Sequence, residues 1–535
     1  MSDIVLTTIN AKYIHAAFGL RYLFANLGEL QTRAEIMEFD LQLRALDIVE
    51  RLLARSPRIV GFGVYIWNVQ LTTQVVTILK RLRPEVCVVL GGPEVSYETD
   101  DQEIVRLSDF VVQGEADLSF AVLCRQLLDP SSSRPSTKII ESPLPTLDQL
   151  KLPYDYYTDD DLRHRVIYVE ASRGCPFTCE FCLSSLDIPV RQFPLELFLE
   201  SLQRLLDRGL NQFKFVDRTF NLNLNVSRAI LSFFLKQHQP GRFYHFEMIP
   251  DRLPEGLREI IRQFPPGTVQ FEVGIQTLNP EVGQRISRRQ NVEALKSNFQ
   301  FLRAETGVHI HADLIVGLPG EGVESFAAGF DQVVALRPQE IQVGILKRLR
   351  GTPIIRHDAE WGMVYHSDPP YEILRTSCLP FEDLQRLRRF ARYWDIVANS
   401  GEFSGSIPLL WERGPEADRS PFWRFLAFSD WAYARLKRTD QIALVRWTEL
   451  LFEFLISHCG QPQEVAARQI WEDYSRPGRR DSPECLKAFL PTDVQHPGRS
   501  LTRTASSTVA GQVPPRQSRH LNVIRHGSEG KSGQL

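Results

Sequence analysis

The run Arg173-Gly-Cys-Pro-Phe-Thr-Cys-Glu-Phe-Cys182 spaces three cysteines, Cys175, Cys179 and Cys182, as CxxxCxxC. Three thiolates can ligate three irons of a four-iron cluster and leave the fourth iron open to a substrate or cofactor. Electron-transfer clusters are usually closed by a fourth cysteine, and structural zinc sites have four protein ligands. The set of three therefore predicts chemistry at a metal. The alternatives are a zinc knuckle completed by a distant ligand, or three unrelated buried thiols.

A strand-like run, Val166-Ile-Tyr-Val-Glu-Ala-Ser172, precedes these cysteines, as it would before an active-site loop of an α/β barrel. Most of the strand candidates that follow are separated by helix-length segments, which predicts a repeating β/α arrangement. These further strand candidates cover residues 212–216, 243–248, 269–274, 308–316 and 340–345.

Residues 1–135 alternate short β-branched runs with amphipathic stretches, the pattern of a parallel sheet wrapped by helices. We expect an α/β, flavodoxin-like or Rossmann-like domain, which binds ligands outside the carboxyl ends of its strands. The expected strands are 4–9, 33–39, 59–64, 86–90 and 110–114, and helix candidates include 44–55 and 69–83.

The residues after these strands are the candidate ligand contacts of this domain. Adjacent glycines there would allow a bulky ligand to approach the backbone closely. The candidates are Tyr65, Asn68, Gly91, Gly92, Glu94, Gly114 and Glu115.

The cysteine loop, with the aromatic Phe181 directly before Cys182, resembles the signature of radical S-adenosylmethionine (radical SAM) enzymes. The resemblance implies a partial (β/α)6 TIM-like barrel over residues 166–380. It also implies a 4Fe-4S cluster on the three cysteines, with Phe181 near the cofactor. In such enzymes the open iron chelates S-adenosylmethionine, and the reduced cluster cleaves it to a 5′-deoxyadenosyl radical.

The N-terminal domain, ahead of this loop, resembles the cobalamin-binding subgroup of the family through Gly91-Gly-Pro-Glu94 and Gly114-Glu115. The resemblance implies cobalamin as a third cofactor. The Asp-x-His-x-x-Gly signature of an axial histidine is absent, because His15 stands four residues before Gly19. His15 is a possible cobalt ligand or a polar residue opening a helix, and the domain could also be a scaffold without corrinoid.

Each later barrel strand offers a further cofactor candidate through the same resemblance. Asp217 occupies the family position near the amino group of S-adenosylmethionine, and a solvated loop carboxylate is the alternative. Glu247 would point inward or outward by alternation along its strand. Gln276 can donate to and accept from a ribose or carboxylate. The run from Asp313 through Gly317 resembles the strand near adenine, or it ends in an ordinary Pro-Gly turn.

A basic group, Lys347, Arg348 and Arg350, follows the sixth strand candidate. These side chains could meet an acidic substrate or the carboxylate of S-adenosylmethionine. An exposed basic loop is the more usual explanation of such a group.

The net charge, the apolar runs and the cysteine distribution limit the classes of partner and the cellular location that we expect. The formal net charge of −3 gives no bulk argument for nucleic acid or an anionic membrane. We find no apolar run of membrane-spanning length and no basic start of a signal peptide. Scattered cysteines in apolar segments favour a reducing, cytoplasmic location. The expected partners are a small-molecule or peptide substrate, not identified by the sequence, and an external electron donor such as flavodoxin or ferredoxin.

Three further regions complete the chain. Residues 136–165 are rich in proline and are expected to form a linker. Amphipathic helices, including 381–394, 422–438 and 440–456, predict a helical C-terminal region over residues 381–490. Residues 491–535 have few large apolar side chains and are expected to be a disordered tail, dispensable for the core.

The resulting hypothesis is a cobalamin-dependent radical SAM enzyme. Methyl transfer to an unactivated substrate position is one outcome, and ring contraction or cyclisation are others. The alternatives are a radical SAM enzyme without bound cobalamin, and a non-enzymatic cobalamin or redox sensor.

Overall fold

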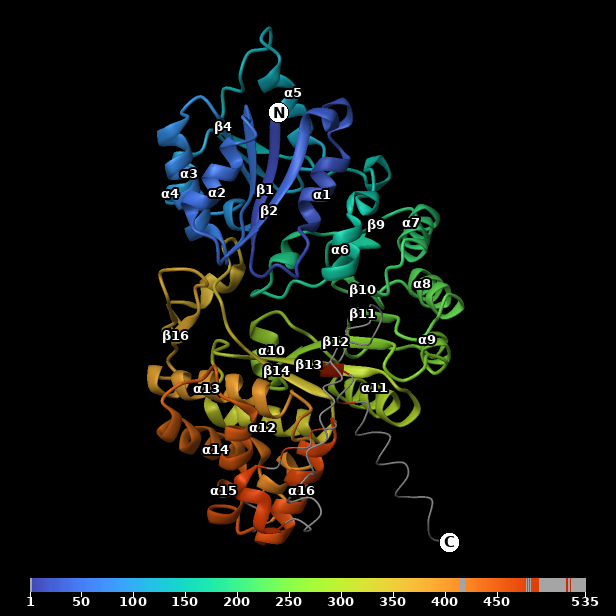
Figure 1. The fold of residues 1–535 in the computed structure, drawn as a ribbon, viewed down its shortest axis with the longest axis vertical. Coiled ribbons are helices and arrows are strands. Elements are labelled where there is room, and N and C mark those ends of the chain that lie inside the picture. Colours follow the sequence, from blue (N-terminus) through green and yellow to red (C-terminus); the bar gives the residue numbers. More distant parts are fainter. Residues whose placement is uncertain are drawn as a thin grey trace. The chain divides into compact units, whose positions relative to one another are not determined.

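The computed structural model describes residues 2–413, 419–477, 479, 481, 483–489, 516–517 and 520 (Figure 1). The chain forms two compact units. Unit 1 comprises Met1–Thr219, Lys347–Arg356 and Tyr365–Ile373, and unit 2 comprises Phe220–Leu346, His357–Val364 and Leu374–Leu535. Within the described residues, no helix combines the length and the apolar character that crossing a bilayer requires.

The first part of unit 1 is a six-stranded parallel sheet in the order β2-β1-β3-β4-β5-β6. The first five strands have the flavodoxin-like order, as the sequence predicts. The sixth strand, β6, lies in the segment that we expected to be a linker. The strands are β1 (Ile4–Asn10), β2 (Ala34–Asp40), β3 (Ile59–Gly63), β4 (Cys87–Gly91), β5 (Phe110–Gln113) and β6 (Ile139–Glu141).

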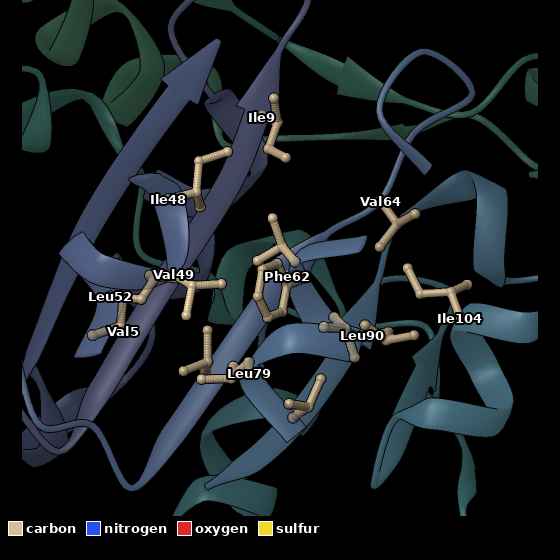
Figure 2. Packing of buried hydrophobic residues seen from close by; sticks show 14 of the residues in the cluster. Val5, Ile9, Ile48, Val49, Leu52, Phe62, Val64, Leu79, Leu90 and Ile104 are labelled. Carbon is tan, nitrogen blue, oxygen red and sulfur yellow. The ribbon is translucent and has the colours of Figure 1, made fainter. Parts of the chain in front are cut away.

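Helices cover both faces of this sheet (Figure 1). Figure 2 shows Ile48 and Leu52 of α2 and Leu79 of α3 packed against strand residues such as Val5 and Phe62. On the other face, α1 and α5 bury leucines and phenylalanines against Ile4 and Leu6. The helices of this domain are α1 (Phe18–Ala25), α2 (Ala45–Leu53), α3 (Val69–Leu82), α4 (Glu103–Leu107) and α5 (Ser119–Leu128).

Gly92, directly after β4, makes a backbone contact that no other residue would allow. Its φ of +105° favours glycine, and a Cβ atom there would lie 2.5 Å from the carbonyl oxygen of Val64. We expect Gly92→Ala to lower the free energy of unfolding by about 2 kcal/mol, because strain of this kind costs about 1–3 kcal/mol. Gly91→Ala is the control, since the nearest atom to its Cβ would be the Val112 carbonyl oxygen at 3.6 Å. Urea unfolding measures both, and equal losses would contradict the argument.

The remainder of unit 1 leads into the cysteine loop. Strand β7 (Ile167–Val169) pairs in parallel with β10 (Gln212–Phe215), and β8 (Ser172–Arg173) pairs antiparallel with β9 (Arg191–Gln192). Helices α6 (Asp159–His164) and α7 (Leu195–Asp207) precede β7 and β10.

Unit 2 contains four parallel strands in the order β14-β13-β12-β11. With β7 and β10, all six barrel strands that the sequence predicts are present. The elements are β11 (Phe243–Met248), β12 (Val269–Gln276), β13 (His309–Val316), β14 (Glu340–Ile345), α8 (Leu224–Lys236), α9 (Glu255–Ile261), α10 (Pro280–Arg285), α11 (Val292–Glu305) and α12 (Val323–Ala335).

The predicted helical C-terminal region is also present. Aromatic side chains form its interior, with the ring centroids of Trp394 and Phe425 4.8 Å apart. Asn399 closes the edge of β14, since its side chain accepts from the amide of Ile341 and donates to the Ile341 carbonyl, each at 2.9 Å. The helices are α13 (Phe381–Val397), α14 (Pro421–Leu436), α15 (Leu444–Ser457) and α16 (Gln463–Ser475), with short strands β15 (Val364–Tyr365) and β16 (Ile373–Arg375) before them.

The tail expected from residue 491 lies outside the described residues, apart from Arg516, Gln517 and His520. These three residues contact earlier parts of unit 2, to which they belong. The Arg516 Nε atom lies 2.9 Å from a Glu340 carboxylate oxygen, and His520 Nε2 lies 3.0 Å from the Asn399 carbonyl. This part of the tail therefore packs on the β14 edge.

Candidate functional site

The three cysteines lie on one loop of unit 1, between β8 and a short 3-10 helix, Leu183–Leu186. Cys175 and Cys179 are buried and Cys182 is half-buried. The loop begins at Gly174, whose φ is +89°, and a Cβ atom there would lie 2.7 Å from the carbonyl oxygen of Asp187. The amide of Cys175 donates to that same carbonyl at 3.0 Å. Glycine is therefore required for the loop to turn back on itself.

Two arginines flank the loop on the paired strands β8 and β9. Arg173 is nearly buried and contacts Glu170, Glu115 and Asp117 at 2.8–2.9 Å. Arg191 contacts Glu115 and, at 3.0 Å, Asp187. Glu115 and Asp117 follow β5, so these ion pairs join the strand ends of the first domain to the base of the cysteine loop.

Glu115 was a candidate for cofactor binding, and the structure assigns its carboxylate to Arg173 and Arg191. Burial alone would raise the pKa of this carboxyl, but hydrogen bonds from the two guanidinium groups lower it below its usual value. Sequence reasoning missed both arginines. The signal available was the position of Arg173 directly before the glycine of the cysteine run.

The donor set, three thiolates on one loop, fits an iron-sulfur cluster. Among the described residues, no three His, Cys, Asp or Glu side chains converge as a mononuclear site would require. Each thiolate of a four-iron cluster binds a different iron, so the sulfurs need not meet at one point. Three cysteines on one loop, with half-buried Phe181 between the last two, therefore fit the group that the sequence predicts.

Asp217, two residues after β10, forms hydrogen bonds with residues that precede this loop. Its carboxylate accepts from the amide of Ala171 at 3.0 Å and from the hydroxyl of Ser172 at 2.6 Å. Burial raises the pKa of Asp217 to about 7, although these hydrogen bonds lower it. The observed contacts are structural, and contact with S-adenosylmethionine stays a prediction.

Asn68 was a candidate ligand contact, and its side chain is hydrogen-bonded within the chain. The residue is fully buried. Its amide nitrogen donates to the carbonyls of Ile9 and Gly63 and to the Thr8 hydroxyl at 3.0–3.1 Å, and its oxygen accepts from the Tyr65 amide at 2.8 Å. Asn68 therefore fixes the turn after β3 to β1.

Of the candidate glycines, Gly91 fits the close approach of a large ligand such as a corrinoid. Packing and backbone conformation explain Gly92, and the φ of +78° explains Gly114. Gly91 has no such internal requirement, because its φ is not positive and a Cβ atom would have room. The absence of a side chain at Gly91 therefore leaves space at the carboxyl end of β4.

Aromatic side chains gather at the ends of β1 and β3. Tyr65 stacks on the half-exposed ring of Trp67, with centroids 4.5 Å apart and an interplanar angle of 5°. His15 Nδ1 lies 2.6 Å from the Tyr168 hydroxyl, and burial lowers the pKa of His15 below its usual value. The observed contact gives His15 a packing role against β7.

Glu94, another candidate at the β4 end, is buried and paired within the chain. Its carboxylate accepts from Arg350 Nε at 2.9 Å and from the Tyr371 hydroxyl at 2.6 Å. Arg348 pairs with Glu98 at 3.1 Å. Arg348 and Arg350 of the basic group after β14 therefore pair with carboxylates of this chain, which neither of the two sequence interpretations anticipated.

In unit 2 the inward and outward faces of the strands are now assigned. Tyr244 and Phe246 of β11 are fully buried, whereas Glu247 lies on the other face with His245, whose ring nitrogen is 2.9 Å from Glu272 of β12. Glu247 therefore shares a face with other polar side chains, as expected for an inward position.

The ends of β12 and β13 carry the remaining candidates. Gln276 has a φ of +70° beside an irregularity in the pairing of β12 with β13. Asp313 lies 3.2 Å from His311 Nε2, and Gly317 has a φ of +91°. The contacts of these residues with S-adenosylmethionine stay predictions.

A buried histidine and carboxylate cluster on β13 and β14 was missed by the sequence analysis. His309 and His311 lie 2.9 and 3.6 Å from the carboxylate of Glu340. Burial lowers the pKa of His309, whereas contacts with Asp313 and Glu340 raise the pKa of His311 despite burial. The alternating positions 309, 311 and 313 would have placed these side chains on one face.

Glu321, after β13, gives a pH dependence that can be measured. Its carboxylate accepts from the Thr277 hydroxyl at 2.7 Å and from Ser325 at 3.2 Å. Burial raises the pKa of Glu321 to about 7 from 4.5. The folded state therefore holds this proton more tightly than the unfolded chain, so its stabilising effect is complete below pH 4.5 and is lost as the pH rises to 7.

We expect Glu321→Gln to remove this loss. Relative to the variant, the wild type should lose about 3 kcal/mol of unfolding free energy between these pH values, since one pKa unit is about 1.4 kcal/mol. Urea midpoints across that range measure the difference. Glu324→Gln, on the exposed side of the first turn of α12, is the control. Parallel pH profiles for wild type and Glu321→Gln would contradict the prediction.

Three family models match successive parts of the chain. Residues 4–123 match a model described as "B12 binding domain", and residues 169–332 match "Radical SAM superfamily". Residues 359–506 match "Protein of unknown function (DUF4080)".

Two curated relatives are each similar to more than half of this chain. An uncharacterized methyltransferase from Pyrococcus horikoshii is 28% identical over 343 residues, which cover 58% of this chain and 71% of the relative. The 2-(S-pantetheinyl)-carbapenam-3-carboxylate methyltransferase of Streptantibioticus cattleyicolor is 24% identical over 356 residues, which cover 59% of this chain and 51% of the relative. The chain thus spans about half the length of the second relative.

A solved structure shares the fold. The radical S-adenosylmethionine methyltransferase TsrM from Kitasatospora setae, with cobalamin and a 4Fe-4S cluster bound, matches with a TM-score of 0.52 at 18% identity. The match covers 66% of this chain and 77% of that structure. The chain therefore contains a region similar to the radical SAM superfamily, and that region follows one similar to a B12-binding domain.

Proposed function

We propose that this chain is a cobalamin-dependent radical SAM enzyme that reductively cleaves S-adenosylmethionine and transfers a methyl group to an unactivated substrate position. One observation carries the proposal. Arg173 and Arg191, which flank the three-cysteine loop, are ion-paired to Glu115 and Asp117 at the end of β5. These ion pairs join the loop to the carboxyl end of β5 in the B12-type sheet, within unit 1.

When bound, a cluster with an open iron supplies the electron for cleavage of S-adenosylmethionine, and cobalamin supplies a carrier for the methyl group. The chain's own residues hold and shield these groups. Cys175, Cys179 and Cys182 would provide the thiolates, while Gly174 sets the direction of the loop. Gly91 would let the corrinoid approach the backbone of β4.

Burial of Cys175 and Cys179 limits access of water to two of the three thiolates. Removal of solvent and the charges around the sulfurs both tune the potential of such a cluster. An external one-electron donor, such as flavodoxin or ferredoxin, would complete the reaction. A reducing compartment such as the cytoplasm would preserve the cluster. The substrate is a small molecule or a peptide.

Anaerobic reconstitution with iron and sulfide tests the proposal. After addition of S-adenosylmethionine and dithionite, we expect 5′-deoxyadenosine by chromatography and mass spectrometry. Added hydroxocobalamin should remain with the protein through gel filtration, with a corrinoid absorption spectrum. Gly91→Leu is the matched variant, and it should weaken corrinoid retention while it leaves nucleoside formation intact.

The alternatives give different results. Nucleoside formation without retained corrinoid would favour a radical SAM enzyme with an empty first domain. A full cluster that does not cleave S-adenosylmethionine would contradict the enzymatic proposal and favour a redox sensor.

A further inference from the structure

The segment of residues 347–356, which belongs to unit 1, contacts two separate parts of that unit; we name it the strap. Its first half docks on the turn after β4. Arg350 donates to the buried carboxylate of Glu94 at 2.9 Å, and the amide of Gly351 donates to Glu98 at 3.1 Å. Gly351 has a φ of +81°, and a Cβ atom there would lie 2.4 Å from the ring of Tyr97.

The second half of the strap docks on the cysteine loop. The amide of Ile354 donates to the carbonyl oxygen of Glu180 at 3.0 Å, and Ile354 is fully buried. The guanidinium of Arg356 forms an ion pair with the Glu180 carboxylate. Glu180 stands between Cys179 and Cys182 and is only 2% exposed. The strap therefore holds both the backbone and the side chain of a residue inside CxxxCxxC.

The charge of Glu180 matters because of where it lies. Glu180 directly follows Cys179 in the chain, and a buried carboxylate near thiolates would repel their negative charge strongly where water is excluded. The Arg356 guanidinium offsets that charge. The reduction potential of an iron-sulfur cluster depends on nearby charge and hydrogen bonding as well as on its ligands.

We propose that Glu180 and Arg356 are positioning residues for the cluster. The pair fixes the cysteine loop to the strap and balances the charge beside the thiolates, and so sets the reduction potential. Through Arg350 and Glu94, the same strap ties this loop to the carboxyl end of β4. The inference rests on the proposed 4Fe-4S cluster and adds to it a residue pair that the cysteine motif does not specify.

Redox titration of the reconstituted protein, without S-adenosylmethionine and followed by electron paramagnetic resonance, tests the charge balance. Glu180→Gln removes a negative charge and should shift the midpoint potential upward. Arg356→Gln removes a positive charge and should shift it downward. Arg356→Lys keeps the charge and should stay near the wild-type potential. Arg204→Gln, which breaks the exposed pair of Arg204 with Asp155, is the control and should not shift it.

Opposite shifts are the decisive result, since loss of packing alone would move both variants in the same direction or release iron from both. Shifts of the same sign, or none, would overturn the proposal. The Arg356 side chain is 59% exposed, so its replacement should leave the fold intact even if Glu180→Gln does not fold.

Hydrogen exchange of the metal-free full chain separates this proposal from the proposed function. Arg356→Gln should accelerate amide exchange in residues 176–186 several-fold, and Arg204→Gln should not. Faster exchange in a chain that assembles no cluster would support the strap contact and contradict the enzymatic function. Unchanged exchange, together with a cluster that cleaves S-adenosylmethionine, would overturn the strap proposal alone.

Discussion

Replacement of Cys179 by alanine is expected to abolish formation of 5′-deoxyadenosine and to lower the iron bound after reconstitution. Cys179 is the central thiol of the loop and is 5% exposed. Its loss would leave two protein ligands where the proposed cluster needs three, and alanine cannot ligate iron. The change should leave the fold in place, since only one sulfur atom is removed. Iron analysis, the visible spectrum and the nucleoside assay measure the result.

Cys378→Ala is the matched control, because Cys378 is an exposed cysteine of unit 2. It should bind iron and form the nucleoside as the wild type does. Equal loss in both variants would indicate general damage by cysteine removal. Full activity of Cys179→Ala would rule out the three-cysteine site.

The second large effect is expected at Arg173, whose guanidinium lies among the carboxylates of Glu170, Glu115 and Asp117. Methionine has a similar length but no charge, so Arg173→Met would leave buried carboxylates without their partner. Removal of one member of a buried ion pair costs about 3–5 kcal/mol. We therefore expect a loss of that size in the free energy of unfolding, together with poor iron incorporation.

Urea unfolding of the metal-free chain measures the stability, so that no cofactor contributes. Arg33→Met is the control, because its pair with Asp3 is partly exposed. Exposed pairs contribute about 0–1 kcal/mol, and the control should stay within that range. A loss below about 1 kcal/mol for Arg173→Met would show that the ion pairs of Arg173 do not stabilise unit 1.

The predicted elements were those with a local signal. Hydrophobic periodicity marked five strands of the first sheet and six barrel strands, because a buried parallel strand needs a continuous apolar run. The cysteine spacing indicated the candidate cluster loop, since its three cysteines are close together in the chain. Strand β6 was missed because Ile139–Glu141 is short and lies between proline-rich stretches.

The contacts of Asn68 could not be predicted from a local pattern. An asparagine after a strand resembles a ligand contact in the sequence, but its partners are carbonyl and hydroxyl groups of β1, about 60 residues away in the chain. Only the pairing of β1 with β3 brings these groups together. A polar side chain at a strand end can therefore serve the turn as well as a cofactor.

Local patterns of the sequence determine three features: the cysteine spacing, the strands and the glycines that follow the strands. Each depends on residues only a few positions apart. The ion pairs around the site depend on folding. Arg173 meets Glu115 across 58 residues, and Arg350 meets Glu94 across 256. No local pattern selects such partners, because each arginine could pair with many carboxylates until strand order and burial bring one within reach. The charges that surround the proposed cofactors are thus decided by tertiary packing.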